Sequence, residues 1–320
     1  MTMIIRGGLR MEKFIILSDV TCDLTEEMRE YFGVKDYIPG HINLGNGQEH
    51  ISKLEWDFIS SKEFYEKLGS KESKITTAPP NLEEYYEKFE KYVKEGYAIL
   101  SMSLSSKISS TYDFACTAAK RVKKDYPEAK IYCFDTLRLS SAFGILTCYA
   151  HELQKEGKSF EEVIAWLEEN KTRVHQMGPI DDLVFIARRG RVTMGAAIMG
   201  TIVGIKPLGD FNDVGYTTVL TKVKGIKKAL NVTLDYVKET ARDIENQYVF
   251  IAHTDRERYA LDLKERVEAE LKPKKVFVGE VFTASGTNIG PGMVGIYYMG
   301  EPVSDDMVKE KEAMNKVLEK

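Results

Sequence analysis

The chain lacks the features that would place it in a disulfide-rich, secreted or membrane class. Its 320 residues include four cysteines, and none of them forms a C-x-x-C pair, so the sequence indicates reduced thiols. The longest apolar runs, such as Ala197 to Ile205, fall short of the about 20 residues that a membrane-spanning helix needs. The start of the chain shows no apolar stretch followed by a small-residue cleavage site. We therefore expect a cytoplasmic protein without a membrane span.

An excess of positive charge is also missing. Lys and Arg number 45 against 49 Asp and Glu, which gives a formal net charge of −4. Nothing is left over to neutralise a phosphate backbone, so we exclude nucleic acid as a partner. Hydrophobic residues make up 43% and charged residues 29%, as in ordinary globular proteins. The length exceeds that of a usual single domain and favours two.

The motifs of common enzyme classes do not occur. The chain has no G-x-x-x-x-G-K-[ST], no G-x-S-x-G and no H-E-x-x-H, and its five histidines are scattered. Gly290 to Gly295 fits G-x-G-x-x-G, but it contains a proline and leads into a predicted strand instead of opening a helix. We predict no metal, no cofactor and no hydrolase triad. A serine nucleophile would need His41, His50 or His253 as its base.

From Phe14 the sequence alternates short β-type runs with amphipathic helical patterns, which is typical of a parallel sheet covered by helices. Asn81 with Glu84, and Ser159 with Glu162, form capping-box pairs that predict helix starts. Residues 207–223 contain two β-type runs around a glycine-rich turn, which indicates a hairpin. The fold class is therefore α/β with two domains. We predict an N-terminal parallel-sheet α/β domain over 12–158, a C-terminal mixed α+β domain over 159–303 and a solvated C-terminal helix or tail over 304–320, with residues 1–10 excluded.

Polar side chains follow the predicted strands of the first half. Asp19 comes after the strand at 14–17, Asp135 comes after the strand at 130–134, and six hydroxyl residues lie within Ser103 to Thr111, after the strand at 97–102. The carboxyl ends of parallel strands meet at one edge of a sheet, where ligands bind. Such hydroxyls and backbone amides suit a carboxylate or a phosphate. The alternative is that they only cap the helices that follow.

Three further segments are candidates for the same site. Thr76 to Pro80 places two hydroxyls on a stiff turn before a helix. Arg188 to Arg191 concentrates cations that either clamp an anion or form a solvated loop. Asn288 to Gly292 lies between two strand patterns, and its glycines indicate a close backbone approach.

Six short segments occur in the order and spacing of one known family. They are Asp19 to Leu24 (family pattern Asp-Ser-x-x-Asp-Leu), Thr76 to Pro80 (Thr-Thr-Ser-Gln-Pro), Ser105 to Tyr112 (Ser-Ser-x-Leu-Ser-Gly-Thr-Tyr), Arg189 to Val192 (Gly-Gly-Arg-Ile), Ile205 to Pro207 (Ile-Lys-Pro) and Asn288 to Gly292 (His-x-Gly-Pro-Gly). Each motif alone is weak. Together they resemble the DegV family of fatty-acid-binding proteins, over residues 13 to about 300.

The resemblance implies a non-catalytic carrier of one long-chain fatty acid. The carboxylate would be held at the domain interface, and the tail would be buried in the C-terminal domain. By this resemblance Thr77, Ala78 and Ser109 hold the carboxylate, and Arg191 or its neighbour Arg189 lies near the head group. Ser110, Asn288 and Gly290 also belong to the implied site. Some family members deliver the lipid to a separate ATP-dependent kinase, so a fatty acid kinase is an implied partner.

Three positions depart from the family pattern. Ala78 replaces a serine, Ser110 replaces a glycine, and Asn288 replaces a histidine. An amide does not exchange a proton near neutral pH, so a proton-transfer role of that histidine would be lost. We therefore expect lipid binding more than kinase coupling. Two alternatives stay open: a carrier of a different amphiphile, such as an isoprenoid acid, and an enzyme that uses the serine-rich loop on an acyl or phosphorylated small molecule.

Overall fold

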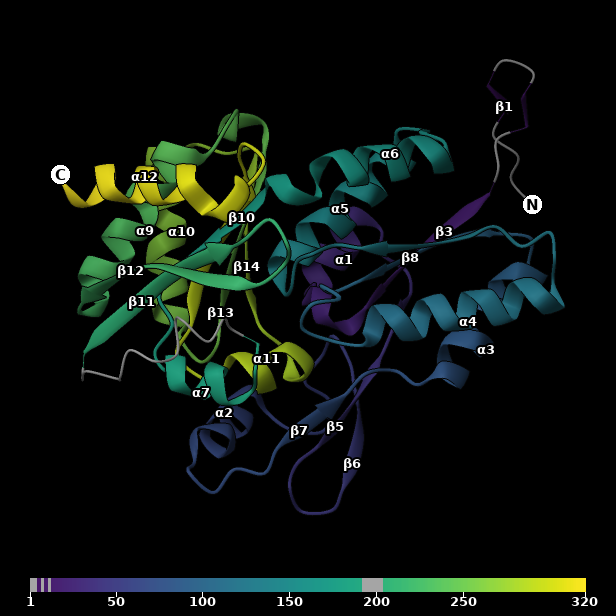
Figure 1. The fold of residues 1–320 in the computed structure, drawn as a ribbon, viewed down its shortest axis with the longest axis horizontal. Helices are drawn as coiled ribbons and strands as arrows, with labels where there is room; N and C mark the ends of the chain where they lie inside the picture. Colours follow the sequence, from purple (N-terminus) through teal and green to yellow (C-terminus); the bar gives the residue numbers. More distant parts are fainter. Residues whose placement is uncertain (1–4, 7–8, 11–12, 192–203) are drawn as a thin grey trace.

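The computed structural model describes residues 5–6, 9–10, 13–191 and 204–320. Residues 197–203 of the apolar run and Val192 of the fourth motif lie outside the described residues. The described chain forms two four-stranded sheets in two halves of the molecule, with a three-stranded sheet below them in the view of Figure 1 and two further two-stranded sheets. This confirms the predicted α/β class, whereas the domain boundaries at 158/159 and 303/304 remain a prediction.

The first sheet is entirely parallel and has the strand order β4-β3-β8-β9. Helices cover both faces of it, so its central strands are apolar on both sides and read as continuous hydrophobic runs. All three strands predicted for this half are confirmed. The strands are β3 (Phe14–Asp19), β4 (Tyr37–Ile38), β8 (Ala98–Ser103) and β9 (Ile131–Asp135).

The helices of this half begin at the capping residues that the sequence indicates. The side chains of Asn81 and Ser159 each accept from the backbone three residues on, and Glu84 and Glu162 complete the two boxes. One face of the sheet carries α3 and α4, and the other carries α1 and α5, against which α6 packs. The bounds are α1 (Glu26–Phe32), α3 (Leu82–Lys94), α4 (Thr111–Asp125), α5 (Ser141–Lys155) and α6 (Phe160–Asn170).

The second sheet is mixed, as predicted for the C-terminal half. Its order is β10-β15-β13-β14, with β13 and β14 parallel and the other neighbours antiparallel. The predicted hairpin is formed by β11 and β12. The bounds are β10 (Val174–Met177), β11 (Ile205–Phe211), β12 (Thr217–Lys224), α9 (Ile226–Thr240), β13 (Tyr248–His253), α10 (Glu257–Glu270), β14 (Lys275–Glu280) and β15 (Val294–Met299).

The C-terminal helix α12 (Val308–Leu318) corrects one expectation. We predicted a solvated helix, but Ala313, Met314 and Val317 are buried against α9 and the hairpin. These three residues share one helical face because they are one to four positions apart. The abundant Lys and Glu hide this stripe in the composition. All of them are exposed except Glu310, which is buried and accepts from Ser304.

Several short elements were not foreseen. Thr76 to Ala78, expected on a turn, form an edge strand of the sheet β6-β5-β7, and Asn288, expected between strands, lies in a helix. Both segments are too short and too hydroxyl-rich to show a period. These elements are β5 (Gly40–Asn43), β6 (Glu49–Ser52), α2 (Ser61–Gly69), β7 (Thr76–Ala78), α7 (Leu183–Arg188) and α11 (Thr283–Ile289).

The remaining elements are small. β1 (Ile5–Arg6) pairs with β2 (Leu9–Arg10), and four 3-10 turns are η1 (Val20–Cys22), η2 (Lys171–Arg173), η3 (Ile244–Asn246) and η4 (Asp305–Met307). The four cysteines are free thiols, two of them buried and two half-buried. Within the ranges given above, no helix is both long enough and apolar enough to cross a bilayer.

A close contact of α5 gives a test of this packing. A Cβ on Gly144 would lie 2.6 Å from the carbonyl oxygen of Cys22 and 2.9 Å from Leu24 Cδ2. We expect Gly144→Ala to lower the free energy of unfolding by about 1–3 kcal/mol despite the better helix propensity of alanine. Gly69→Ala is the control, because a Cβ there meets only Pro291 at 3.4 Å. Urea denaturation measures both, and equal stability of the two variants would contradict the packing described.

Candidate functional site

Two adjoining cavities lie at the carboxyl edge of the first sheet, where it faces the second half of the chain. We call one of them the polar cavity and the other the apolar cavity, after the side chains that line them. Four residues line both cavities and thereby join them: Ile108, Leu139, Arg191 and Asn288.

The structure brings together five of the seven site residues expected from the sequence. Thr77, Ala78, Ser109, Arg191 and Asn288 all line the polar cavity. They come from β7, from the loop before α4, from the segment after α7 and from α11. Segments as much as 211 residues apart along the chain meet here, since the Asn288 Nδ2 donates to Thr77 Oγ1.

Ser110 and Gly290 line neither cavity. Ser110 is exposed and forms the N-terminal boundary of α4, without a side-chain cap. Gly290 has a φ of 83° and ends α11, and a Cβ on it would lie 2.7 Å from the ring of Phe185. The close backbone approach expected at this glycine is therefore to a side chain of the protein itself.

The hydroxyl groups of the polar cavity are held by hydrogen bonds within the protein. Ser109 Oγ lies 2.8 Å from Thr111 Oγ1 and accepts from the Thr111 amide at 3.2 Å. Asn288 Nδ2 donates to Thr77 Oγ1 and to the Ala284 carbonyl, both at 3.2 Å. The hydroxyl hydrogen of Thr77 remains able to donate into the cavity, because its oxygen is the acceptor in that bond.

A buried carboxylate that was not assigned to the site also lines the polar cavity. Asp19 accepts from the Thr21 amide at 2.8 Å, from Thr21 Oγ1 at 2.5 Å and from the Leu104 amide at 2.9 Å. Burial raises the pKa of Asp19 to about 6, and these hydrogen bonds oppose the rise. The sequence signal for Asp19 as a site residue was its position directly after a predicted strand. Asp135 on β9 lines neither cavity, but it accepts from the Leu137 amide and from the Ser106 amide in the loop after β8.

A second buried carboxyl lies next to Asp19, at the junction with α11. Asp23 Oδ1 accepts from the Phe282 amide at 3.0 Å, while Oδ2 has no well-aligned partner. Burial raises the pKa of Asp23 to about 7. The hydroxyls of Ser140 and Ser285 face this carboxyl and oppose the rise. The junction between the two halves thus contains a carboxyl group that resists ionisation.

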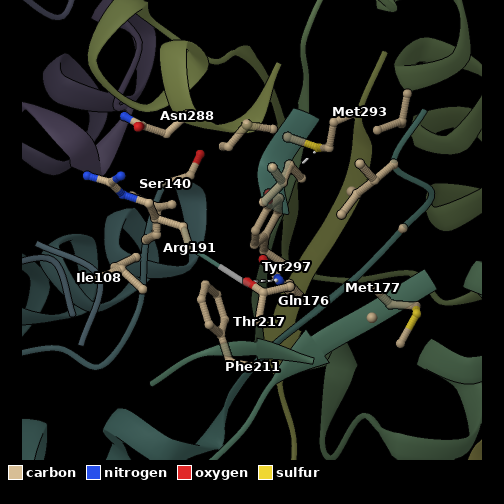
Figure 2. Close-up of a pocket in the computed structure, with 18 residues that line it drawn as sticks. Ile108, Ser140, Gln176, Met177, Arg191, Phe211, Thr217, Asn288, Met293 and Tyr297 are labelled. Carbon is tan, nitrogen blue, oxygen red and sulfur yellow. Dashed lines mark hydrogen bonds between the residues drawn. The ribbon is translucent and has the colours of Figure 1, made fainter. Parts of the chain in front are cut away.

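The apolar cavity belongs to the C-terminal half of the chain. Figure 2 shows Phe211 from β11 and Tyr297 from β15 pointing into it, with Met293 beside them and Arg191 and Asn288 at the end that adjoins the polar cavity. Only Arg191 of the basic cluster lines the cavities, where it donates to the Arg189 carbonyl, while Arg189 lies over the ring of Phe185. Sequence spacing gave no signal for these apolar residues.

The geometry supports binding more than nucleophilic attack. The Ser109 hydroxyl contacts Thr111, whereas His41 on β5 contacts Glu84 at 2.8 Å. Within the part of the chain that the structure describes, no group of three or more His, Cys, Asp or Glu side chains could hold a metal ion. The two cavities together place hydroxyl and amide groups at one end and an apolar space at the other.

Comparison with known proteins agrees with this architecture. Residues 13–301 match the family model described as "Uncharacterised protein, DegV family". This chain belongs to the DegV family. A DegV domain-containing protein of Clostridium perfringens is 31% identical, over 91% of this chain and 99% of the relative.

Two solved DegV structures have the same fold. The DegV family protein from Thermus thermophilus, described as binding fatty acid, has a TM-score of 0.80 at 25% identity, covering 90% of this chain and 99% of its own. DegV from Bacillus subtilis, described as a fatty acid binding protein, has a TM-score of 0.74 at 27% identity, covering 91% and 100%.

The raised pKa of Asp23 predicts a pH dependence of stability. A carboxyl whose pKa is higher in the folded state than in the unfolded state destabilises the fold as the pH rises from about 4 to about 7. Asn at this position can still accept from the Phe282 amide and carries no charge. We expect Asp23→Asn to gain roughly 2–4 kcal/mol in free energy of unfolding, relative to wild type, between these pH values.

Asp36 provides a control of opposite sign. Burial raises its pKa, but hydrogen bonds from Tyr92 and Lys88 outweigh burial and hold the pKa below its usual value. Asp36→Asn should therefore cost stability at neutral pH and cost less as the pH falls through about 4. Denaturation at several pH values measures both variants, and a pH-independent effect of Asp23→Asn would contradict the prediction.

Proposed function

We propose that this protein is a non-catalytic carrier that binds one long-chain fatty acid. The carboxyl group lies in the polar cavity, and the acyl tail lies in the apolar cavity. The observation that carries this proposal is the junction of the two cavities through four shared residues. The DegV proteins of Thermus thermophilus and Bacillus subtilis, both described as binding fatty acid, support it.

The tail supplies most of the affinity. Each methylene that leaves water contributes about 0.8 kcal/mol, so a long chain gains more from the apolar cavity than a head group gains from a few neutral hydrogen bonds. Ile180 and Ile186 from the segment around α7 line the same cavity as Phe211 and Tyr297. The polar cavity thus suits the head group of an amphiphile, and the apolar cavity suits its tail.

The head group meets neutral donors. Thr77 and Ser109 offer hydroxyls, and Ala78 keeps its backbone amide where the family pattern has a serine. A net hydrogen bond to a neutral group contributes about 0.5–1.5 kcal/mol, enough to fix the orientation of the lipid. Arg191 lies at the junction of the cavities, next to the expected position of the carboxyl group.

We propose that the protein carries the lipid and does not catalyse a reaction on it. Asn288 stands where the family pattern has histidine, and its amide nitrogen is bound to Thr77 and Ala284. An amide at this position orients the site without exchanging protons. Presentation of the lipid to a separate fatty acid kinase is a further step, and binding as proposed here does not depend on it.

The first experiment is a native mass spectrum of the purified protein, followed by denaturation and identification of any released molecule. An excess mass of a few hundred daltons that resolves into a fatty acid supports the carrier. A phosphorylated or non-carboxyl ligand would overturn the assignment of a fatty acid. A protein that is empty and also ignores added fatty acids would overturn the carrier function itself.

The head-group assignment gives a matched pair of variants. Thr77→Ala combined with Ser109→Ala should weaken retention of a carboxyl lipid about 10- to 100-fold, since two hydrogen-bonding hydroxyls are removed. Ser110→Ala, one residue away but exposed and outside both cavities, should leave retention unchanged. Lipid bound per protein after extraction is the readout, and unchanged lipid in the double variant would count against the site.

A further inference from the structure

The charges that line the polar cavity already balance before any ligand enters. Among its described lining residues the charged side chains are Asp19 and Arg191. A carboxylate placed beside them would add a second negative charge without a second cation. A buried charge without a partner is costly, and proteins usually avoid it by changing the protonation state of a group. This argument rests on the proposed function.

The groups around Asp19 do not supply the missing positive charge. Cys22 and Asp23 face Asp19 from its own segment, and Tyr85 faces it from α3. Burial raises the pKa of the Cys22 thiol and of the Tyr85 phenol, so both are neutral at pH 7. Asp23 adds either no charge or a further negative charge. Arg191 is the one cation in this set.

The hydrogen bonds of the Asn288 amide also favour a protonated lipid carboxyl group. Its nitrogen donates to the Ala284 carbonyl and to Thr77 Oγ1, which uses both of its hydrogens and leaves Oδ1 as an acceptor. The Thr77 hydroxyl is a donor toward the cavity. A protonated lipid carboxyl group can accept from the Thr77 hydroxyl and donate to Asn288 Oδ1. A carboxylate has no hydrogen to donate, so its oxygen and Oδ1 would face each other as two acceptors.

We propose that the polar cavity takes up one proton with each fatty acid that it binds, shared between the lipid carboxyl group and Asp19, and therefore prefers a neutral, hydrogen-bonding head group to a permanently charged one. When the site is empty, the negative charge resides on Asp19, because its two oxygens accept three hydrogen bonds. Burial raises the pKa of Asp19 to about 6, so this group also accepts a proton readily when a second negative charge arrives.

Calorimetry with three ligands of equal length tests the proposal on the delipidated, unaltered protein. The ligands are dodecanoic acid, dodecanol and dodecanesulfonate, each added below its micelle concentration in two buffers of different ionisation enthalpy at about pH 7.5. The free acid is ionised there, because a carboxyl group has an ordinary pKa of about 4. The buffer dependence of the enthalpy should report uptake of about one proton per acid bound and none per alcohol. The sulfonate should bind at least tenfold more weakly than the alcohol.

The outcomes separate this proposal from the function on which it rests. Dodecanoic acid that binds without a buffer-dependent enthalpy, or a sulfonate that binds as tightly as the alcohol, would overturn the proton uptake and leave the carrier intact. No binding of any of the three ligands would overturn the proposed function.

A pair of aspartate variants assigns the effect to one residue. Asp19→Asn should raise the affinity for the sulfonate about tenfold or more and reduce the proton uptake. Asp113→Asn is the control, because Asp113 is exposed on α4 and lines neither cavity. Circular dichroism first shows whether each variant is folded. If Asp19→Asn is unfolded, the three-ligand comparison on the unaltered protein still decides the proposal.

Discussion

The site depends on one set of hydrogen bonds, those that hold the ends of neighbouring parallel strands together. Asp19, the last residue of β3, accepts from the Leu104 amide beyond β8, and Asp135, the last residue of β9, accepts from the Ser106 amide. The loop that follows β8 is therefore fixed from both sides. Ser109 reaches the polar cavity because this loop has little freedom left before α4 begins at Thr111. The fixed loop provides preorganised donors, so ordering them on binding costs little.

The short helix α11 supplies the second constraint. Its sequence, Thr-Ala-Ser-Gly-Thr-Asn-Ile, has few strong helix formers, so tertiary contacts must hold it in place. Phe282 donates to Asp23 just before the helix, Tyr65 donates to the Val281 carbonyl at 2.5 Å, and Thr283 lies 2.7 Å from Ser52. These contacts carry Asn288 to Thr77. The polar cavity thus combines groups from both halves of the chain.

The regular elements could be predicted because each carries a local signal. Asn81 and Ser159 begin helices by capping boxes that involve residues three positions apart, and β3 and β8 are apolar enough to stand out against the helices between them. The prediction failed for elements whose local signal was absent or was hidden by the composition. The strand at Thr76 to Ala78 forms because it pairs with β5, and the helix at Thr283 to Ile289 forms because it packs on Tyr65. The buried stripe of α12 is hidden in the sequence by the many Lys and Glu residues around it.

The sequence by itself determined the α/β class, the order of the main elements, the family resemblance and five of the residues that line the polar cavity. Those conclusions rest on periodicity, capping and short motifs, which act within a few residues of one another. Only the tertiary structure showed that Ser110 is exposed and that Gly290 makes room for Phe185. It also showed that Asp19 shares the polar cavity with Arg191, and that Phe211 and Tyr297 line the apolar one. Charge balance and cavity shape arise from residues far apart in the chain, so no local pattern encodes them.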